Sequence, residues 1–349
     1  MKLTRREMLA ASLAAMPTVG ALASSPKPVA WPQLGVVIHS YGIRIGADRR
    51  KGVRPGFSDP LVFLEHCHEL GAAGIQVGIG ARDRAYVREL RRKCDAYRMY
   101  LEGTVQLPRD RKDLDRFTAE VRTARDAGAT VLRTVLLNGR RYETFNTAAA
   151  FITWHDQAYH SLTLAEPVAG RHRVELAVEN HKDLRSDELI ALLKRLASPR
   201  VGFCVDTGNS IALLEDPLAV VEALAPWART THFKDMAVAE FADGFLLSEV
   251  PLTQGFLDLT AIVAVLRRAR PGIHFNLEMI TRDPLRVPCL TPRYWATFQS
   301  LPGRYLAQTL ALVRKHKSSR PLPHVSTLPE AQRMEVEENN VRVSLRRPR

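Results

Sequence analysis

The chain has 349 residues, of which 46% are hydrophobic and 25% are charged, and its net charge is +13. This length allows one large α/β domain or two smaller ones, and either can bury a full core. No stretch reaches the ~18–20 uninterrupted apolar residues of a membrane-spanning helix. The basic residues are scattered among acidic ones, which argues against a dedicated nucleic-acid surface.

The N-terminal 23 residues have the pattern of an export signal. Lys2, Arg5 and Arg6 precede an apolar run that closes with an Ala-Leu-Ala cleavage motif. The sequence TRREML also resembles a twin-arginine signal, whose route carries folded proteins; an ordinary secretory signal is the alternative. We therefore expect residues 1–23 to be a signal peptide, residues 24–33 to be a proline-rich linker, and the mature protein to be exported to the periplasm.

From residue 34 onward, short apolar runs alternate with amphipathic segments, which predicts strands that alternate with helices. The expected strands are 34–41, 74–80, 100–108, 130–137, 174–179, 201–206, 228–235 and 273–280. The expected helices are 58–70, 84–97, 113–127, 147–168, 186–196, 217–225, 259–268 and 305–315. We expect 42–55, 138–145 and 236–258 to be the loops that decide the substrate.

Eight strand–helix units over residues 34–317 predict a (β/α)8 TIM barrel. The rival is a doubly wound sheet, but the sequence contains neither of the glycine-rich phosphate loops that are typical of that fold. Residues 318–349 are expected to form a C-terminal extension that lies over the barrel or is partly disordered. The four cysteines show no paired spacing, so we interpret them as mostly buried or unpaired thiols.

Four of the expected strands have, at or near their carboxyl ends, a residue that can bind a metal: Glu179, Asp206, His232 and Glu278. In a barrel, side chains at the carboxyl ends of neighbouring strands converge on one mouth. Each residue has an ordinary explanation when taken alone, such as a helix cap for Asp206. Together, three carboxylates and one imidazole suit one divalent ion, Mn, Mg, Co or Zn, and the absence of a thiolate argues against a structural zinc site.

The segments around these residues resemble the xylose isomerase-like barrel superfamily, in its sugar phosphate isomerase/epimerase group. The motifs are VENH at 178–181, VDTGN at 205–209, HFKD at 232–235 and LE at 277–278, and the resemblance covers about 34–315. It implies that Glu179, Asp206, His232 and Glu278 bind one divalent metal. It also implies that Glu179 and Glu278 face each other across the substrate as catalytic acid and base.

Other residues near these motifs are candidates for substrate binding. Asn209 stands where many members of the superfamily have histidine, which argues against the trinuclear zinc site of its endonuclease branch, and its amide is expected to replace that substrate contact. His181 and Lys234 lie just beyond ligand strands, and His39 ends the first strand. Arg282 is a candidate for an anionic substrate group, although it could equally pair with its neighbour Asp283.

The expected chemistry begins at a carbonyl that the metal polarises. One carboxylate removes the proton next to that carbonyl to form an enediolate, and the other returns a proton. The sequence therefore predicts a metal-dependent isomerase or epimerase of a small-molecule sugar or keto-sugar. The alternatives are a keto-glycoside lyase or cyclitol dehydratase with the same site, which export favours, and a non-catalytic carbohydrate-binding barrel. No oligomeric state is predicted.

Overall fold

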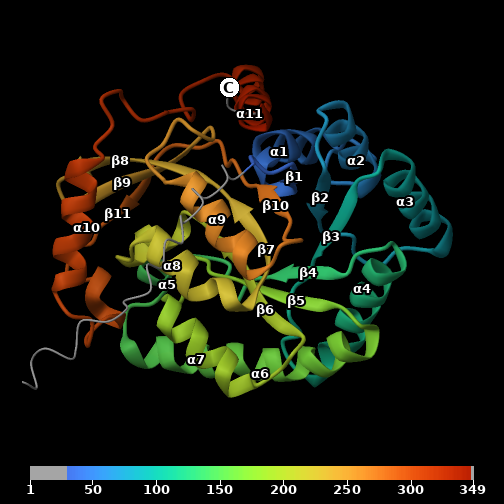
Figure 1. Cartoon of the computed structure of the whole chain (residues 1–349), viewed down its shortest axis with the longest axis horizontal. Helices are drawn as coiled ribbons and strands as arrows, with labels where there is room; N and C mark the ends of the chain where they lie inside the picture. Colours follow the sequence, from blue (N-terminus) through green and yellow to red (C-terminus); the bar gives the residue numbers. More distant parts are fainter. Residues whose placement is uncertain (1–29, 347–349) are drawn as a thin grey trace, which may run out of the picture. The chain divides into compact units, whose positions relative to one another are not determined.

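Eight parallel strands close into a barrel in the computed structural model of the chain, which describes residues 30–346 (Figure 1). Their order around the barrel is β1-β10-β7-β6-β5-β4-β3-β2. The strands are β1 (Leu34–Val37), β2 (Gly74–Val77), β3 (Tyr100–Thr104), β4 (Val131–Thr134), β5 (Glu175–Glu179), β6 (Val201–Asp206), β7 (Ala228–Phe233) and β10 (Phe275–Leu277). The predicted (β/α)8 barrel is confirmed. The predicted signal peptide and most of the linker lie outside the described residues.

Helices follow the strands along the chain, and most of them surround the barrel (Figure 1). They are α2 (Pro60–Glu69), α3 (Arg84–Tyr97), α4 (Leu114–Asp126), α6 (Ala148–His172), α7 (Ser186–Leu196), α8 (Pro217–Leu224), α9 (Leu259–Ala269) and α10 (Arg304–Lys315). Shorter helices are α5 (Arg141–Thr144) and the 3-10 segments η2 (Arg111–Asp113), η3 (Asn209–Leu213), η4 (Ala225–Trp227) and η5 (Tyr294–Thr297). No helix within residues 30–346 is long and apolar enough to cross a membrane.

Aspartate caps and apolar stripes explain where these helices begin and which face they bury. Asp59, Asp83, Asp216 and Asp258 each accept a backbone N–H of the first turn of the helix that follows. On α3 the buried side chains Val87, Leu90 and Cys94 recur at helical spacing, and most of the other side chains are charged. These stripes pack on the outer faces of the strands to form the main core. All four cysteines are buried and free, as predicted.

The segment after β1 differs from the predicted loop. The strand stops at Val37 and continues as a 3-10 turn, η1 (Ile38–Tyr41), and then as helix α1 (Gly42–Lys51). The helix ends at Gly52, whose φ of +67° is a left-handed conformation that suits glycine. At its start, the backbone N–H groups of Ile43 and Arg44 donate to Glu337, a residue near the C-terminus of the chain. The prediction failed because this cap comes from a residue far away in the sequence.

The predicted loop 236–258 contains a β-hairpin. Its strands β8 (Asp235–Phe241) and β9 (Gly244–Val250) pair antiparallel, and β11 (Leu285–Val287) joins them in a three-stranded sheet. Figure 1 shows this sheet beside α10. A second apolar cluster, which includes Val238, Phe245 and Leu247, lies between the sheet and its neighbours. The hairpin therefore has a core of its own and frames one side of the barrel mouth.

The segment predicted to be a C-terminal extension contains a helix, α11 (Glu330–Leu345), that packs on α1, η1 and β10 (Figure 1). The carboxylate of Glu337, which is buried, accepts hydrogen bonds from the backbone N–H groups of Ile43 at 2.7 Å and Arg44 at 2.9 Å. Asn340 donates to Thr281 at 3.0 Å, in the segment after β10. The last helix thus holds two segments that border the barrel mouth.

Candidate metal centre and active site

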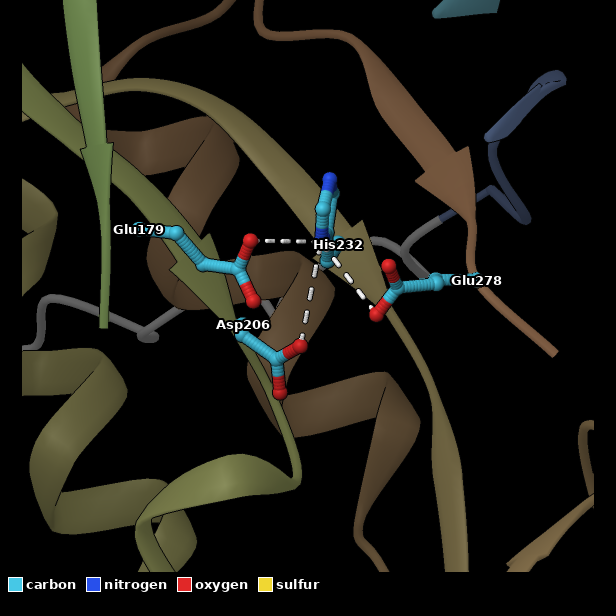
Figure 2. Close-up of side chains that lie close together, drawn as sticks. All are labelled: Glu179, Asp206, His232 and Glu278. Atoms are coloured by element: carbon cyan, nitrogen blue, oxygen red, sulfur yellow. Dashed lines mark ion pairs between the residues drawn. The ribbon is translucent and has the colours of Figure 1, made fainter. Parts of the chain in front are cut away.

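The four predicted metal ligands lie at the carboxyl ends of neighbouring barrel strands. Glu179 ends β5, Asp206 ends β6, His232 is next to last in β7, and Glu278 directly follows β10. Because β5, β6, β7 and β10 are adjacent in the barrel, their side chains enter the same mouth. Figure 2 shows the three carboxylates arranged around the imidazole. The structure thus brings the four residues together.

The donor atoms of these residues fit a single divalent cation. One donor atom from each residue lies within 4.8 Å of the others. His232 Nδ1 is 3.3 Å from Glu179 Oε2, 3.3 Å from Glu278 Oε2 and 3.9 Å from Asp206 Oδ2. All four side chains are buried, and His232 Nδ1 forms no hydrogen bond. Three carboxylates and one imidazole suit Mg²⁺, Mn²⁺, Co²⁺ or Zn²⁺.

Both glutamates of the centre are held in the ionised form that binds a cation. Burial alone would raise the pKa of Glu179, but Arg133 and His232 outweigh it and hold that pKa well below its usual value. Burial would also raise the pKa of Glu278, but His232 and Lys234 outweigh it and hold that pKa well below its usual value. The positive charges around the centre therefore stabilise the carboxylates although they are buried.

The orientation of His232 is set from inside the barrel. Its Nε2 lies 2.7 Å from Gln76 Oε1, and Gln76 Nε2 donates to Glu102 Oε2 at 3.0 Å. Since the amide of Gln76 must donate to the carboxylate, its oxygen faces the ring and accepts a hydrogen bond from the Nε2–H group. This assignment makes Nδ1, the atom that faces the three carboxylates, the ring nitrogen that gives up its proton when a cation binds.

Two protein groups hold Glu179. Arg133, on β4, donates from Nε to Glu179 Oε2 at 2.7 Å and makes a second contact from Nη2. Asn209 donates from Nδ2 to Glu179 Oε1 at 3.0 Å, and its Oδ1 accepts from Lys182 and from Lys234. Protein groups therefore occupy both polar atoms of the Asn209 amide, which was predicted to contact substrate.

Glu278 is held in a similar way by two predicted substrate-binding residues. His39 Nδ1 lies 2.9 Å from Glu278 Oε1. His39 lies in the 3-10 segment η1, whereas the sequence predicted it at the end of a strand. Lys234 Nζ lies 2.6 Å from Glu278 Oε2 and 2.9 Å from Asp206 Oδ2. Lys234 thus forms ion pairs with two of the candidate ligands.

A cavity of about 390 Å³ lies beside the centre and is bordered by Glu179 and Glu278. Of the predicted substrate-binding residues, four line it and Asn209 does not: His39, His181, Lys234 and Arg282. Burial lowers the pKa of His181 to about 3, so its ring is neutral, and its Nδ1 is buried without a hydrogen bond.

Arg282 does not pair with Asp283, the alternative that the sequence left open. Arg282 Nε donates to Glu249 on β9 at 3.2 Å, and Nη2 makes a second contact. Asp283 instead accepts backbone N–H groups from Val325 and Ser326. The hairpin that the sequence did not predict therefore supplies the partner of a cavity residue.

Sequence reasoning missed several residues of the site. Arg133 is a charge inside the apolar run TVLRTVLL, Gln76 is the polar residue of GIQVGIG, and Lys182 directly follows the motif VENH. A polar residue at a buried strand position must have a partner, which is the signal that could have identified Arg133 and Gln76. Glu249 had no such signal, because its hairpin was expected to be a loop.

A family model described as a xylose isomerase-like TIM barrel matches residues 64–315, a range that includes all four candidate ligands. The chain belongs to this family. It is also 29% identical over 223 residues to 3-oxo-isoapionate decarboxylase from Pectobacterium atrosepticum, a similarity that covers 62% of this chain and 76% of that protein.

Solved structures with the same fold include members that bind magnesium or sugars. A xylose isomerase-like TIM barrel protein from Mycobacterium smegmatis in complex with magnesium is 17% identical, with a TM-score of 0.54 and coverage of 80% of this chain and 98% of that one. D-psicose 3-epimerase from Clostridium cellulolyticum H10, solved with D-tagatose, is 11% identical, with a TM-score of 0.55 and coverage of 81% and 99%. At these identities the similarity shows the fold alone.

Proposed function

We propose that the protein is a metal-dependent isomerase or epimerase of a sugar or keto-sugar. The observation that carries this proposal is the pair of ionised carboxylates, Glu179 and Glu278, on either side of His232 in one buried centre (Figure 2). Both border a cavity large enough for a small sugar. Membership of the xylose isomerase-like family supports it, and a non-catalytic binding barrel would not need two opposed carboxylates.

A divalent ion held by Glu179, Asp206, His232 and Glu278 would polarise the substrate carbonyl and so acidify the neighbouring C–H group. One glutamate takes this proton on a carboxylate oxygen. The other glutamate, once it has received a proton from solvent, delivers that proton to the opposite face or to the adjacent carbon and becomes ionised again. Lys234 keeps Glu278 ionised and in place. His39, whose side chain is 40% exposed, connects Glu278 to solvent and can carry the proton away.

The test measures solvent-deuterium exchange at the carbon next to the carbonyl. Mn²⁺-loaded protein is incubated with D-fructose, D-tagatose or D-psicose, and the exchange is monitored by NMR. We expect Glu278→Gln to slow exchange by at least about 100-fold, because the variant loses a proton-transfer group. Metal content is measured in parallel, with Asp206→Ala expected to lose the ion and surface Glu240→Gln as the control. An unchanged exchange rate in metal-loaded Glu278→Gln would show that the mechanism is wrong.

A second candidate, elimination or decarboxylation, uses the same centre. It is favoured by the similarity to a decarboxylase and by the many cationic side chains around the cavity. In decarboxylation of a 3-oxo acid, the bond to the carboxylate carbon breaks, its electron pair becomes that of the enolate, carbon dioxide leaves, and an acid then protonates the carbon. Release of carbon dioxide, or of the alcohol of a 3-keto-glycoside, without deuterium exchange in recovered substrate would favour this candidate.

A further inference from the structure

The cavity beside the centre is lined by more cations than carboxylates. Its cations are Arg133, Arg140, Lys182, Lys234 and Arg282, and its carboxylates are Glu143, Glu179 and Glu278. Behind the wall, Asp206 and Glu249 bring the carboxylates to the same number as the cations. A divalent ion would add two positive charges, so the loaded site would have a net positive charge.

Four of these five cations have a carboxylate partner within ion-pair distance. The pairs are Arg133–Glu179, Arg140–Glu143, Lys234 with Asp206 and Glu278, and Arg282–Glu249. Lys182 differs from the others. Among residues 30–346 no carboxylate forms an ion pair with it, and its ammonium group donates to the amide oxygen of Asn209. A charged group buried without an opposite charge costs free energy of folding.

Lys182 is 2% exposed and yet borders the cavity. It reaches the centre through one residue, since the Asn209 amide that accepts from it also donates to Glu179 at 3.0 Å. Next to it along the chain, His181 offers the buried Nδ1 that has no hydrogen bond. An ammonium group and an imidazole thus border the cavity beside a candidate metal ligand.

We propose that Lys182 binds a carboxylate carried by the substrate, so that the substrate is a sugar-derived oxo acid and not a neutral sugar. This inference rests on the proposed function, because it assumes that the substrate carbonyl lies at the metal centre. The ammonium group supplies the charge that a carboxylate needs, and His181 supplies a contact for a neighbouring hydroxyl. A carboxylate is favoured over a phosphate because a single lysine supplies one point charge, whereas a phosphate dianion usually binds several donors.

The test compares two ligands that differ at one carbon. 2-Keto-D-gluconate has a carboxylate where D-fructose has a hydroxymethyl group, and both have the ketone at C2. Binding of each to Mn²⁺-loaded wild-type protein is measured by titration calorimetry. We expect the keto acid to bind at least about 10-fold more tightly, as a hydrogen bond between charged groups predicts. In Lys182→Met the two ligands should bind with affinities that differ by no more than about 3-fold.

Arg140→Met is the matched control, because it removes a cavity cation that has its own carboxylate partner, and it should keep the preference for the keto acid. Lys182→Met should be as thermally stable as the wild type or more so, since an unpaired buried charge is lost. A lysine needed only for folding would give a less stable variant with an unchanged binding ratio, which would overturn the proposal.

Other outcomes would also overturn it. A preference for the keto acid that survives in Lys182→Met would place the carboxylate on the metal. Tighter binding of D-fructose 6-phosphate than of the keto acid would indicate a phosphate site. Weak binding of the keto acid at millimolar concentration would show that no carboxylate site exists. If the protein binds no metal but shows the Lys182-dependent preference, the proposed function fails and only the contact between Lys182 and a ligand carboxylate stands. Deuterium exchange in D-fructose without the preference would support the proposed function and overturn this inference.

Discussion

At the scale of single residues, the centre is made of buried charges that depend on one another. Glu179, Asp206 and Glu278 are buried, and each is next to a cation or an amide that stabilises its ionised form. Buried ion pairs contribute little net stability, but removing one partner leaves the other uncompensated. These residues are therefore better explained by the chemistry of the site than by the stability of the fold.

Gln76 offers a test at this scale that does not touch the cation itself. Because it accepts from His232 Nε2, we expect Gln76→Met to free the imidazole to rotate or change tautomer. Removing such an outer partner typically weakens metal binding by about 10–100-fold. The affinity for Mn²⁺ is measured by titration calorimetry on the metal-free protein.

Thr134→Val is the control for this change, since Thr134 is also a buried polar residue of a barrel strand but its hydroxyl has no hydrogen bond. Its Mn²⁺ affinity should equal that of the wild type. Equal affinity in Gln76→Met as well would mean that the barrel interior does not orient His232.

At the scale of elements, two segments predicted as loops are ordered by parts of the chain that are distant in sequence. Helix α1 is capped by Glu337 of α11, and the β8–β9 hairpin is completed by β11. Helix α1 follows directly on η1, which contains His39, the partner of Glu278. The C-terminal helix thus connects to the candidate metal centre through α1, η1 and the hydrogen bond between His39 and Glu278.

Glu337→Ala should lower the free energy of unfolding by about 1–2 kcal/mol, the usual effect of losing a helix cap. Urea unfolding measures the change. Glu335→Ala is the control because Glu335 is an exposed glutamate on the same helix. Similar losses in both variants would show that the two backbone hydrogen bonds of Glu337 do not stabilise α1.

The stability that depends on Glu337 should also change with pH. Burial raises its pKa to about 7, although the backbone N–H groups of Ile43 and Arg44 act in the opposite direction. The folded state therefore holds the proton more tightly than the unfolded state. The stabilisation of the folded state by this bound proton is fully present below the unfolded pKa of about 4.5 and is lost as pH rises to about 7. We expect this slope to be absent from Glu337→Gln.

At the scale of the whole molecule, the sequence of residues 1–23 predicts a role separate from that of the barrel. We propose that residues 1–23 direct export by the twin-arginine route, which carries folded proteins. Since a metal site built from distant strands forms only when the barrel is folded, this route would let the ion be loaded before export. The pattern of Lys2, Arg5 and Arg6 before an apolar run supports the proposal.

Fusion of residues 1–30 to green fluorescent protein tests this proposal in a bacterium with a periplasm. We expect fluorescence in the periplasm, because the fused protein must fold before it crosses the membrane. Replacing Arg5 and Arg6 with lysine should keep the fluorescence in the cytoplasm while preserving the charge. Export of non-fluorescent fusion protein would indicate an ordinary secretory signal instead.

The sequence by itself determined the barrel and the four candidate ligands. Both follow from local patterns, because buried parallel strands are short apolar runs and a charge at the end of such a run lies at the barrel mouth. Only the tertiary structure decided that Arg133 holds Glu179, that Gln76 orients His232, that Glu337 caps α1 and that Lys182 borders the cavity without an ion pair. These contacts join residues that are mostly far apart in the chain, so neither periodicity nor local propensity contains them.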